Sequence, residues 1–166
     1  MQDLEAFLIN RFNGAQKLCI LGAGSFMKAD DAAGVLITEK LLEEFDVLNH
    51  PNLLILSGES APENCCGEIK RFSPDHLCVI DAADMGESPG SIVFIENEVI
   101  SGVTFSTHML PVKIMLDYLV KETGCKITVM GIQPVDLTYD GKVTQKVAET
   151  VEYVTQVLSR LCEIGY

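Results

Sequence analysis

The chain has 166 residues and a formal net charge of −12, from 24 acidic and 12 basic residues. This length predicts one domain over residues 1–166, and the acidic balance disfavours nucleic acid or an anionic membrane while favouring a cationic or basic partner. No apolar run reaches the roughly 18 residues of a membrane helix, and no secretory signal begins the chain, so we expect a cytoplasmic protein that is monomeric when free.

Near-continuous apolar runs predict the strands of a parallel sheet that is covered on both faces. In chain order these runs are Leu18–Gly22, Leu53–Ser57, Leu77–Asp81 and Lys126–Met130. A fifth run, Ser91–Glu96, alternates less cleanly and follows Pro89-Gly90. We therefore place it at or near an edge of the sheet, where an antiparallel orientation is an option.

Segments with helical periodicity alternate with these strands. They are Asp3–Arg11, Ala32–Glu44, a short helix from Ser60-Ala-Pro-Glu63, Met109–Lys121 and Val143–Leu161. The short helix has the spacing of a capping box and a proline in its first turn. The alternation predicts an α/β fold: a three-layer α/β/α sandwich around a five-stranded, mostly parallel sheet.

The loop after the first predicted strand begins like a dinucleotide-binding fingerprint, with Gly22-Ala-Gly24. Met27 stands where the third glycine belongs, and Asp30 and Asp31 at the helix start would repel a pyrophosphate. We therefore expect no nucleotide.

An aspartate at a helix start can also cap the helix, and one is enough for that role. We assign the cap to Asp30 and a ligand role to Asp31, although the sequence leaves the reverse assignment open.

Asp81 ends the third predicted strand, and His108 lies at the predicted start of a helix. The carboxyl ends of neighbouring strands in an open α/β sheet meet at one crevice, so we expect Asp31, Asp81 and His108 to gather there. Such a set could hold a divalent metal such as zinc or nickel, or perform acid–base chemistry. Structural roles stay open for two of them: Asp81 bonded to loop amides, and His108 buried against backbone groups.

Other polar residues fit structural roles. Asp84 lies among turn residues and is predicted to stabilise its loop. His50 and His76 are predicted to lie on the surface. The side chains of the adjacent Cys65 and Cys66 diverge, so we predict free thiols there, with a thiol nucleophile as an alternative.

Several segments, taken together and in order, resemble the hydrogenase maturation endopeptidases. They are Gly22-Ala-Gly-Ser-Phe-Met-Lys-Ala-Asp-Asp31, Ser60-Ala-Pro-Glu-Asn64, Ile80-Asp-Ala-Ala-Asp-Met-Gly86, Thr107-His108 and Gly131-Ile-Gln-Pro134. The second and third of these segments are most similar to the branch that serves formate-hydrogenlyase-type hydrogenases.

The resemblance implies an aspartic-type endopeptidase that removes the C-terminal extension of a nickel-iron hydrogenase large-subunit precursor. It implies that Asp31, Asp81 and His108 are both the catalytic residues and the contacts to nickel, which the precursor carries. Asp31 or Asp81 would be the base for the attacking water. A non-catalytic, nickel-sensing chaperone on the same fold is the alternative.

The chain departs from the family pattern at Ser25, where asparagine is usual, and at Ala29 and Ala32, where glycines flank the aspartate pair. Alanine tolerates a positive φ poorly, so we expect the path of this loop to differ slightly.

Overall fold

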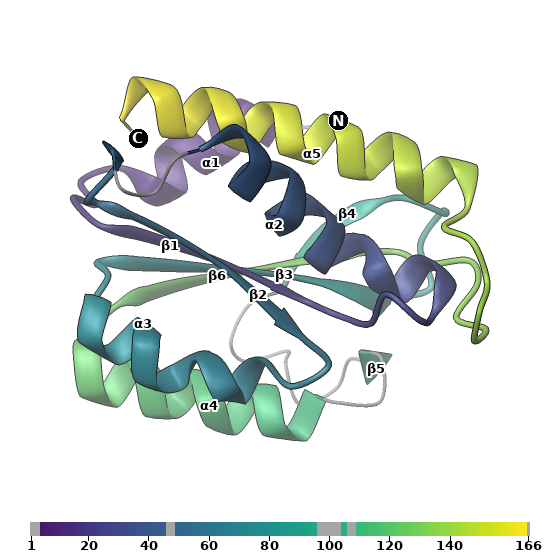
Figure 1. Ribbon diagram of the computed structural model, residues 1–166, viewed down its shortest axis with the longest axis horizontal. Coiled ribbons are helices and arrows are strands. Elements are labelled where there is room, and N and C mark those ends of the chain that lie inside the picture. Colours follow the sequence, from purple (N-terminus) through teal and green to yellow (C-terminus); the bar gives the residue numbers. More distant parts are fainter. Residues whose placement is uncertain (1–3, 46–48, 96–103, 106–108, 166) are drawn as a thin grey trace.

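Five strands form a mixed sheet between two layers of helices (Figure 1). The computed structural model describes residues 4–45, 49–95, 104–105 and 109–165. Across the sheet the order is β2 (Leu53–Glu59), β1 (Leu18–Ala23), β3 (His76–Asp84), β6 (Lys126–Ile132) and β4 (Ile92–Ile95). The first four are parallel, and β4 pairs antiparallel with β6 at the edge, so the predicted architecture is confirmed, including the edge position of the fifth run.

The helices cover the sheet unequally. One face carries α1 (Leu4–Phe12), α2 (Ala33–Glu44) and α5 (Gln145–Ile164), and the other carries α3 (Cys66–Phe72) and α4 (Met109–Thr123) (Figure 1). Each face has its own apolar core. The central strands contribute alternate residues to both cores, as Ile20 and Leu21 do from β1. A strand buried on both faces reads as a continuous apolar run, which is why these strands are visible in the sequence.

Two local features differ from the sequence prediction. A two-residue strand, β5 (Thr104–Phe105), pairs antiparallel with the end of β3 and was not predicted. The short helix begins as a 3₁₀ turn, η3 (Pro62–Cys65), whose N-cap Ala61 makes no side-chain hydrogen bond. The predicted capping box at Ser60 is therefore wrong, whereas the proline does lie at the helix start.

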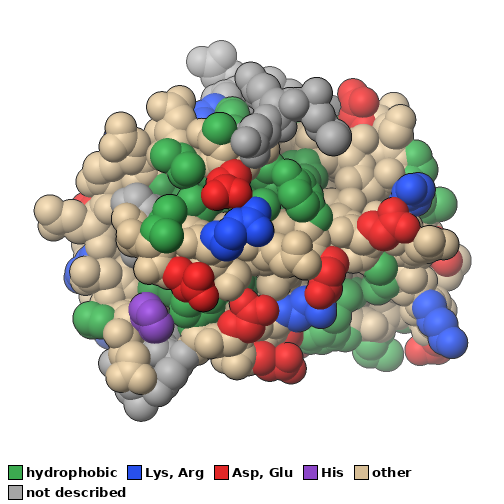
Figure 2. All heavy atoms as spheres, turned by 90° about the horizontal axis from the view of Figure 1, so that it is seen from above, with side chains coloured by type: hydrophobic (Ala, Val, Ile, Leu, Met, Phe, Trp, Pro, Cys, Tyr) green, Lys and Arg blue, Asp and Glu red, His purple; other side chains and the backbone are tan. Residues whose placement is uncertain are grey.

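The outer surface of the larger helical layer mixes acidic, basic and apolar side chains (Figure 2). Ion pairs link its helices, including Lys40 to Glu152 at 3.0 Å and Arg160 to Glu5 at 2.9 Å. Both pairs are largely exposed, so each stabilises the fold by no more than about 1 kcal/mol. Within the described residues, no helix combines the length and apolar character needed to span a bilayer.

Candidate active site

The carboxyl ends of the parallel strands lie on the right in Figure 1. Two acidic residues lie at this edge of the sheet, near enough for the charge of one to act on the other. Asp81 lies in β3, and Asp31 lies in a 3₁₀ turn, η1 (Ala29–Ala32), that leads directly into α2. Glycines allow this close approach. A Cβ at Gly34 would lie 2.2 Å from the Ile80 carbonyl oxygen, and one at Gly24, whose φ is +126°, would lie 1.8 Å from the carbonyl oxygen of Asp31. The glycine loop thus brings the start of α2 against the end of β3.

Asp31 is a fully buried acid whose carboxylate has no hydrogen-bond partner among the described residues. Its side chain is 0 % exposed, and within that part of the chain neither carboxylate oxygen accepts a hydrogen bond. A buried carboxylate without a partner is costly, and folded proteins rarely retain one. Stability of the fold alone therefore gives no reason for an acid at this position.

Asp81 is also buried, at 5 % exposure, and its Oδ1 accepts one hydrogen bond, from the Ala82 amide at 2.8 Å. Burial raises its pKa to about 8, and the nearby charge of Asp31 raises it as well, while the Ala82 bond opposes both effects. Two carboxylates this close and this buried do not readily ionise together. The structure thus brings Asp31 and Asp81 together, as predicted.

Asp30 has the structural role expected of one of the two aspartates, but not by capping its own helix, since η1 has no side-chain cap. Its Oδ2 accepts hydrogen bonds from the Val135 amide at 2.8 Å, the Asp136 amide at 3.0 Å and the Thr144 hydroxyl at 3.0 Å. Its Oδ1 accepts one from the Thr144 amide at 2.6 Å. Asp30 thus fastens the loop before α5 to the loop that carries Asp31.

A small cavity of about 10 Å³, enough for roughly one water molecule, lies beside Asp81. Its lining comes from the ends of β1 and β2, the start of η3 and α4: Ala23, Gly24, Glu59, Ser60, Pro62, Asp81 and Val112. Glu59 has a φ of +47°, a strained conformation for a residue with a side chain. Glu59 was not among the predicted site residues; its position directly before the Ser60–Asn64 segment was the available signal.

His108 lies outside the described residues, as does Thr107. The chain on either side is described. Phe105 of β5 pairs with Ala83, two residues beyond Asp81, and Val112 of α4 lines the same cavity as Asp81. Among the residues that the structure describes, no three acidic, histidine or cysteine side chains form a metal-binding group.

Asp84 and Gln133 organise the loop that follows Asp81. The Asp84 Oδ1 accepts hydrogen bonds from the Gly86 amide at 3.2 Å and from Gln133 Nε2 at 3.0 Å, which confirms its predicted loop role. The Gln133 Oε1 accepts from the amides of Met85 and Glu87. This assigns a structural task to the glutamine of the Gly131-Ile-Gln-Pro134 segment.

All six cysteines are described and free, as predicted for Cys65 and Cys66. Burial is the main cause that raises the pKa of both of these thiols, with nearby glutamates adding to the effect. A raised pKa lowers the fraction of reactive thiolate, so neither residue has the environment of a cysteine nucleophile.

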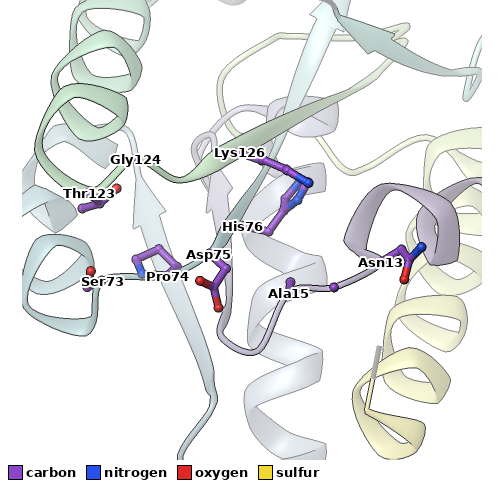
Figure 3. Close-up of a pocket in the computed structure, with 10 residues that line it drawn as sticks. Asn13, Ala15, Ser73, Pro74, Asp75, His76, Thr123, Gly124 and Lys126 are labelled. Carbon is purple, nitrogen blue, oxygen red and sulfur yellow. The ribbon is translucent and has the colours of Figure 1, made fainter.

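The amino edge of the sheet holds a second polar pocket, of about 280 Å³, in which Asp75, His76 and Lys126 lie close together (Figure 3). The prediction that His76 lies on the surface is wrong, because its side chain is 3 % exposed. Its Nε2 lies 2.8 Å from Thr128 Oγ1, and its ring packs edge-on against Phe12. Burial lowers the pKa of His76 to about 4, with Lys126 and Arg11 adding to the shift.

Known proteins resemble this chain in sequence and in fold. The hydrogenase 3 maturation protease of Escherichia coli K12 is 34 % identical over 140 residues, which cover 84 % of this chain and 86 % of that protein. The crystal structure of a [NiFe] hydrogenase maturation protease from Thermococcus kodakarensis superimposes with a TM-score of 0.86 at 29 % identity, covering 95 % of this chain and 99 % of the other. The solution structure of an E. coli endopeptidase of the same kind superimposes with a TM-score of 0.75 at 31 % identity. That match covers 87 % of this chain and 90 % of the other.

A family model described as hydrogenase maturation protease matches residues 35–160, a range that contains Asp81 and His108 and begins just after Asp31. This match and the hydrogenase 3 relatives are also consistent with the branch that the motifs indicated. The chain therefore belongs to the hydrogenase maturation protease family, and it is a peptidase.

Proposed function

We propose that this protein removes the C-terminal extension of a nickel-loaded, nickel-iron hydrogenase large-subunit precursor. In this proposal Asp31, Asp81 and His108 recognise the nickel that the precursor already carries, so that precursor without nickel is not cut. The protein acts as a cytoplasmic monomer of the formate-hydrogenlyase-type branch.

One observation carries this proposal: Asp31 is buried beside Asp81, and neither of its carboxylate oxygens has a hydrogen-bond partner among the residues that the structure describes. A divalent cation between the two carboxylates would supply the missing partner and offset the repulsion between them. Two carboxylates and an imidazole leave coordination positions open, which suits a cation that arrives with ligands of its own from the precursor.

The third ligand is assigned to His108 by the resemblance. Its support from the described residues is indirect: β5 ends at Phe105 next to the end of β3, and Val112 of α4 borders the cavity beside Asp81. Both segments that flank residues 106–108 therefore reach the same edge of the sheet as the two acids.

The same pair of acids can serve hydrolysis. Because its pKa is about 8, Asp81 carries a proton near neutral pH when no cation is bound. In the complex with the nickel-loaded precursor, the cation would favour the ionised form of both acids, so one of them, Asp31 or Asp81, accepts a proton from water as the water oxygen attacks the scissile carbonyl carbon. The same acid returns that proton to the leaving amine when the peptide C–N bond breaks, and the nickel of the precursor holds the peptide in place.

The test is to incubate the purified protein with nickel-loaded and nickel-free precursor and to follow the mass of the large subunit. We expect a short C-terminal peptide to be lost from the loaded form alone. Equal cleavage of both forms would refute recognition of nickel, and tight binding without cleavage would identify the protein as the nickel-sensing chaperone instead.

A further inference from the structure

Exposed apolar side chains are concentrated on two loops beside the acidic pair. Among the described residues, eleven large hydrophobic side chains are exposed, and five of them lie on these loops. We call this group the apolar rim: Phe26, Met27, Val135, Leu137 and Tyr139. The first two belong to the loop between β1 and η1, and the other three to the loop between β6 and α5.

Backbone contacts join the two loops into one surface. Lys28 and Tyr139 form an isolated antiparallel bridge, and the Asp140 amide donates to the Met27 carbonyl oxygen at 2.8 Å. The Asp30 amide donates to the Asp136 carbonyl oxygen at 2.9 Å. The Lys28 ammonium group also lies 5.2 Å from the centre of the Tyr139 ring.

The Asp30 carboxylate holds this surface in place. Through its four hydrogen bonds it fixes the Val135 and Asp136 amides and the start of α5. A rim that is ordered before binding loses little conformational entropy when a partner covers it. Exposed apolar side chains gathered on such a surface are typical of a protein-binding site.

The rim is continuous with the proposed site. Asp30 is bonded to the loop before α5, and the Asp31 amide that follows it donates to the carbonyl oxygen of Lys28, next to Met27, so a protein that presents a cation to Asp31 must lie close to the rim. A second copy of this chain offers no cation for Asp31, whereas the precursor in the proposed function does. This makes the precursor the occupant that fits both the rim and the acids.

We propose that the apolar rim is the docking surface for an apolar region of the large-subunit precursor, next to the end that is cleaved. The inference rests on the proposed function and adds where the precursor is held. The rim gives binding energy for the folded precursor, while the acidic pair selects for the cation.

The test compares a Met27→Ser, Tyr139→Ser double variant with a Tyr153→Ser, Ile164→Ser control. The control also changes two exposed apolar residues, both on α5. Tyr153 is 45 % exposed and Ile164 is 69 % exposed, whereas Met27 and Tyr139 of the rim are 60 % and 67 % exposed. Thermal unfolding first verifies that both variants fold. Processing of nickel-loaded precursor then gives kcat and KM, and direct binding of the precursor gives Kd.

We expect the rim variant to raise KM and Kd at least about tenfold with kcat unchanged, because it removes apolar area buried on docking, and the control to match the wild type. Values within twofold of the wild type would overturn the rim proposal while leaving the proposed function intact. If the wild type binds the precursor without cutting it, the proposed function fails, and the Kd values still decide the rim. If the wild type neither binds nor cuts it, both proposals fail.

A second copy is the competing occupant. Sedimentation of the wild type and the rim variant decides this point, with a monomer expected for both. A wild-type dimer that the rim variant converts to a monomer would overturn the proposal.

Discussion

The carboxyl and amino ends of the parallel sheet differ in how well their polar side chains are hydrogen-bonded. At the amino end, the Asp75 Oδ2 accepts from the amides of Gln16 and Lys17 at 2.9 and 2.8 Å, and His76 is bonded to Thr128. At the carboxyl end, the Asp31 carboxylate has no hydrogen-bond partner within the part of the chain that the structure describes. Both ends contain polar groups and a cavity, so neither feature alone identifies a functional site. The unsatisfied acid makes the carboxyl end the candidate for a functional site, because a ligand would supply the missing partner.

The largest expected effect is on catalysis. Asp31→Asn and His108→Ala should each lower processing of the nickel-loaded precursor by about 10³-fold or more, since each removes a group of the proposed site. Both should leave the fold near wild type. Asp75→Asn is the matched control at the amino end and should process normally per folded molecule. Rates from large-subunit mass, with circular dichroism as the check on folding, measure this; wild-type processing by both site variants would refute the assignment.

Asp30 and Asp31 are adjacent in sequence, and their asparagine variants should separate stability from activity. Asp30→Asn weakens four hydrogen bonds to a buried carboxylate and should lower the free energy of unfolding by about 3 kcal/mol. Asp31→Asn loses no hydrogen bond and should unfold at the same or higher urea concentration than the wild type. Equal destabilisation by the two variants would contradict the division of roles.

Asp81 should make the carboxyl end less stable as pH rises. The pKa of Asp81 is about 8 in the folded protein, against 3.8 in the unfolded chain. Between pH 3.8 and pH 8 the folded state therefore holds a proton on Asp81 that the unfolded chain has lost. The free energy of unfolding falls as pH rises through this window. Asp81→Asn cannot lose that proton. Its free energy of unfolding should exceed that of the wild type by about 3 to 4 kcal/mol more at pH 8 than at pH 5. Urea unfolding at both pH values measures the change, and a difference independent of pH would contradict the account.

His76 should give the opposite pH dependence at the amino end. Its pKa falls from 6.5 to about 4 on folding, so the unfolded chain binds the extra proton between these values, and stability is lost as pH falls through this window. His76→Gln removes the titrating ring. Between pH 7 and pH 4.5 the wild type should lose roughly 1 to 2 kcal/mol more than this variant. Parallel stability curves for the two proteins would show that the buried histidine does not titrate in this way.

The smallest effects concern one strained backbone position at each end. Ser73 follows α3 with a φ of +51°, and Glu59 has a φ of +47° beside Asp81. Replacing either residue by glycine should raise the free energy of unfolding of the protein by about 1 kcal/mol. Ser73→Gly should process normally, whereas Glu59→Gly should process more slowly, because strain of this kind persists at functional sites. Equal activity of the two variants would make Glu59 a structural residue.

The architecture was predictable because the central strands are buried on both faces and are therefore apolar throughout. The strand β5 was not predictable, since two residues carry no periodicity and are ordered by pairing with the end of β3. The buried state of His76 was missed because Phe12, which packs against it, lies 64 positions earlier in α1.

The site was predictable in part. The apolar run before Asp81 located it, although β3 continues to Asp84 and does not end at Asp81 as predicted, but the sequence could not decide between Asp30 and Asp31. That decision depends on donors 105 to 114 residues away in the loop before α5. The apolar rim escaped detection for the same reason, because its two loops are joined only in the folded chain. His108 stays a prediction.

The central claim is that Asp31 and Asp81 share one buried site, and NMR titration of the Asp81 carboxyl carbon tests it most directly. The account predicts a midpoint near pH 8 in the wild type and a lower one in Asp31→Asn, because the neighbouring charge is removed while burial remains. A wild-type midpoint near 3.8, or one that Asp31→Asn leaves unchanged, would contradict it.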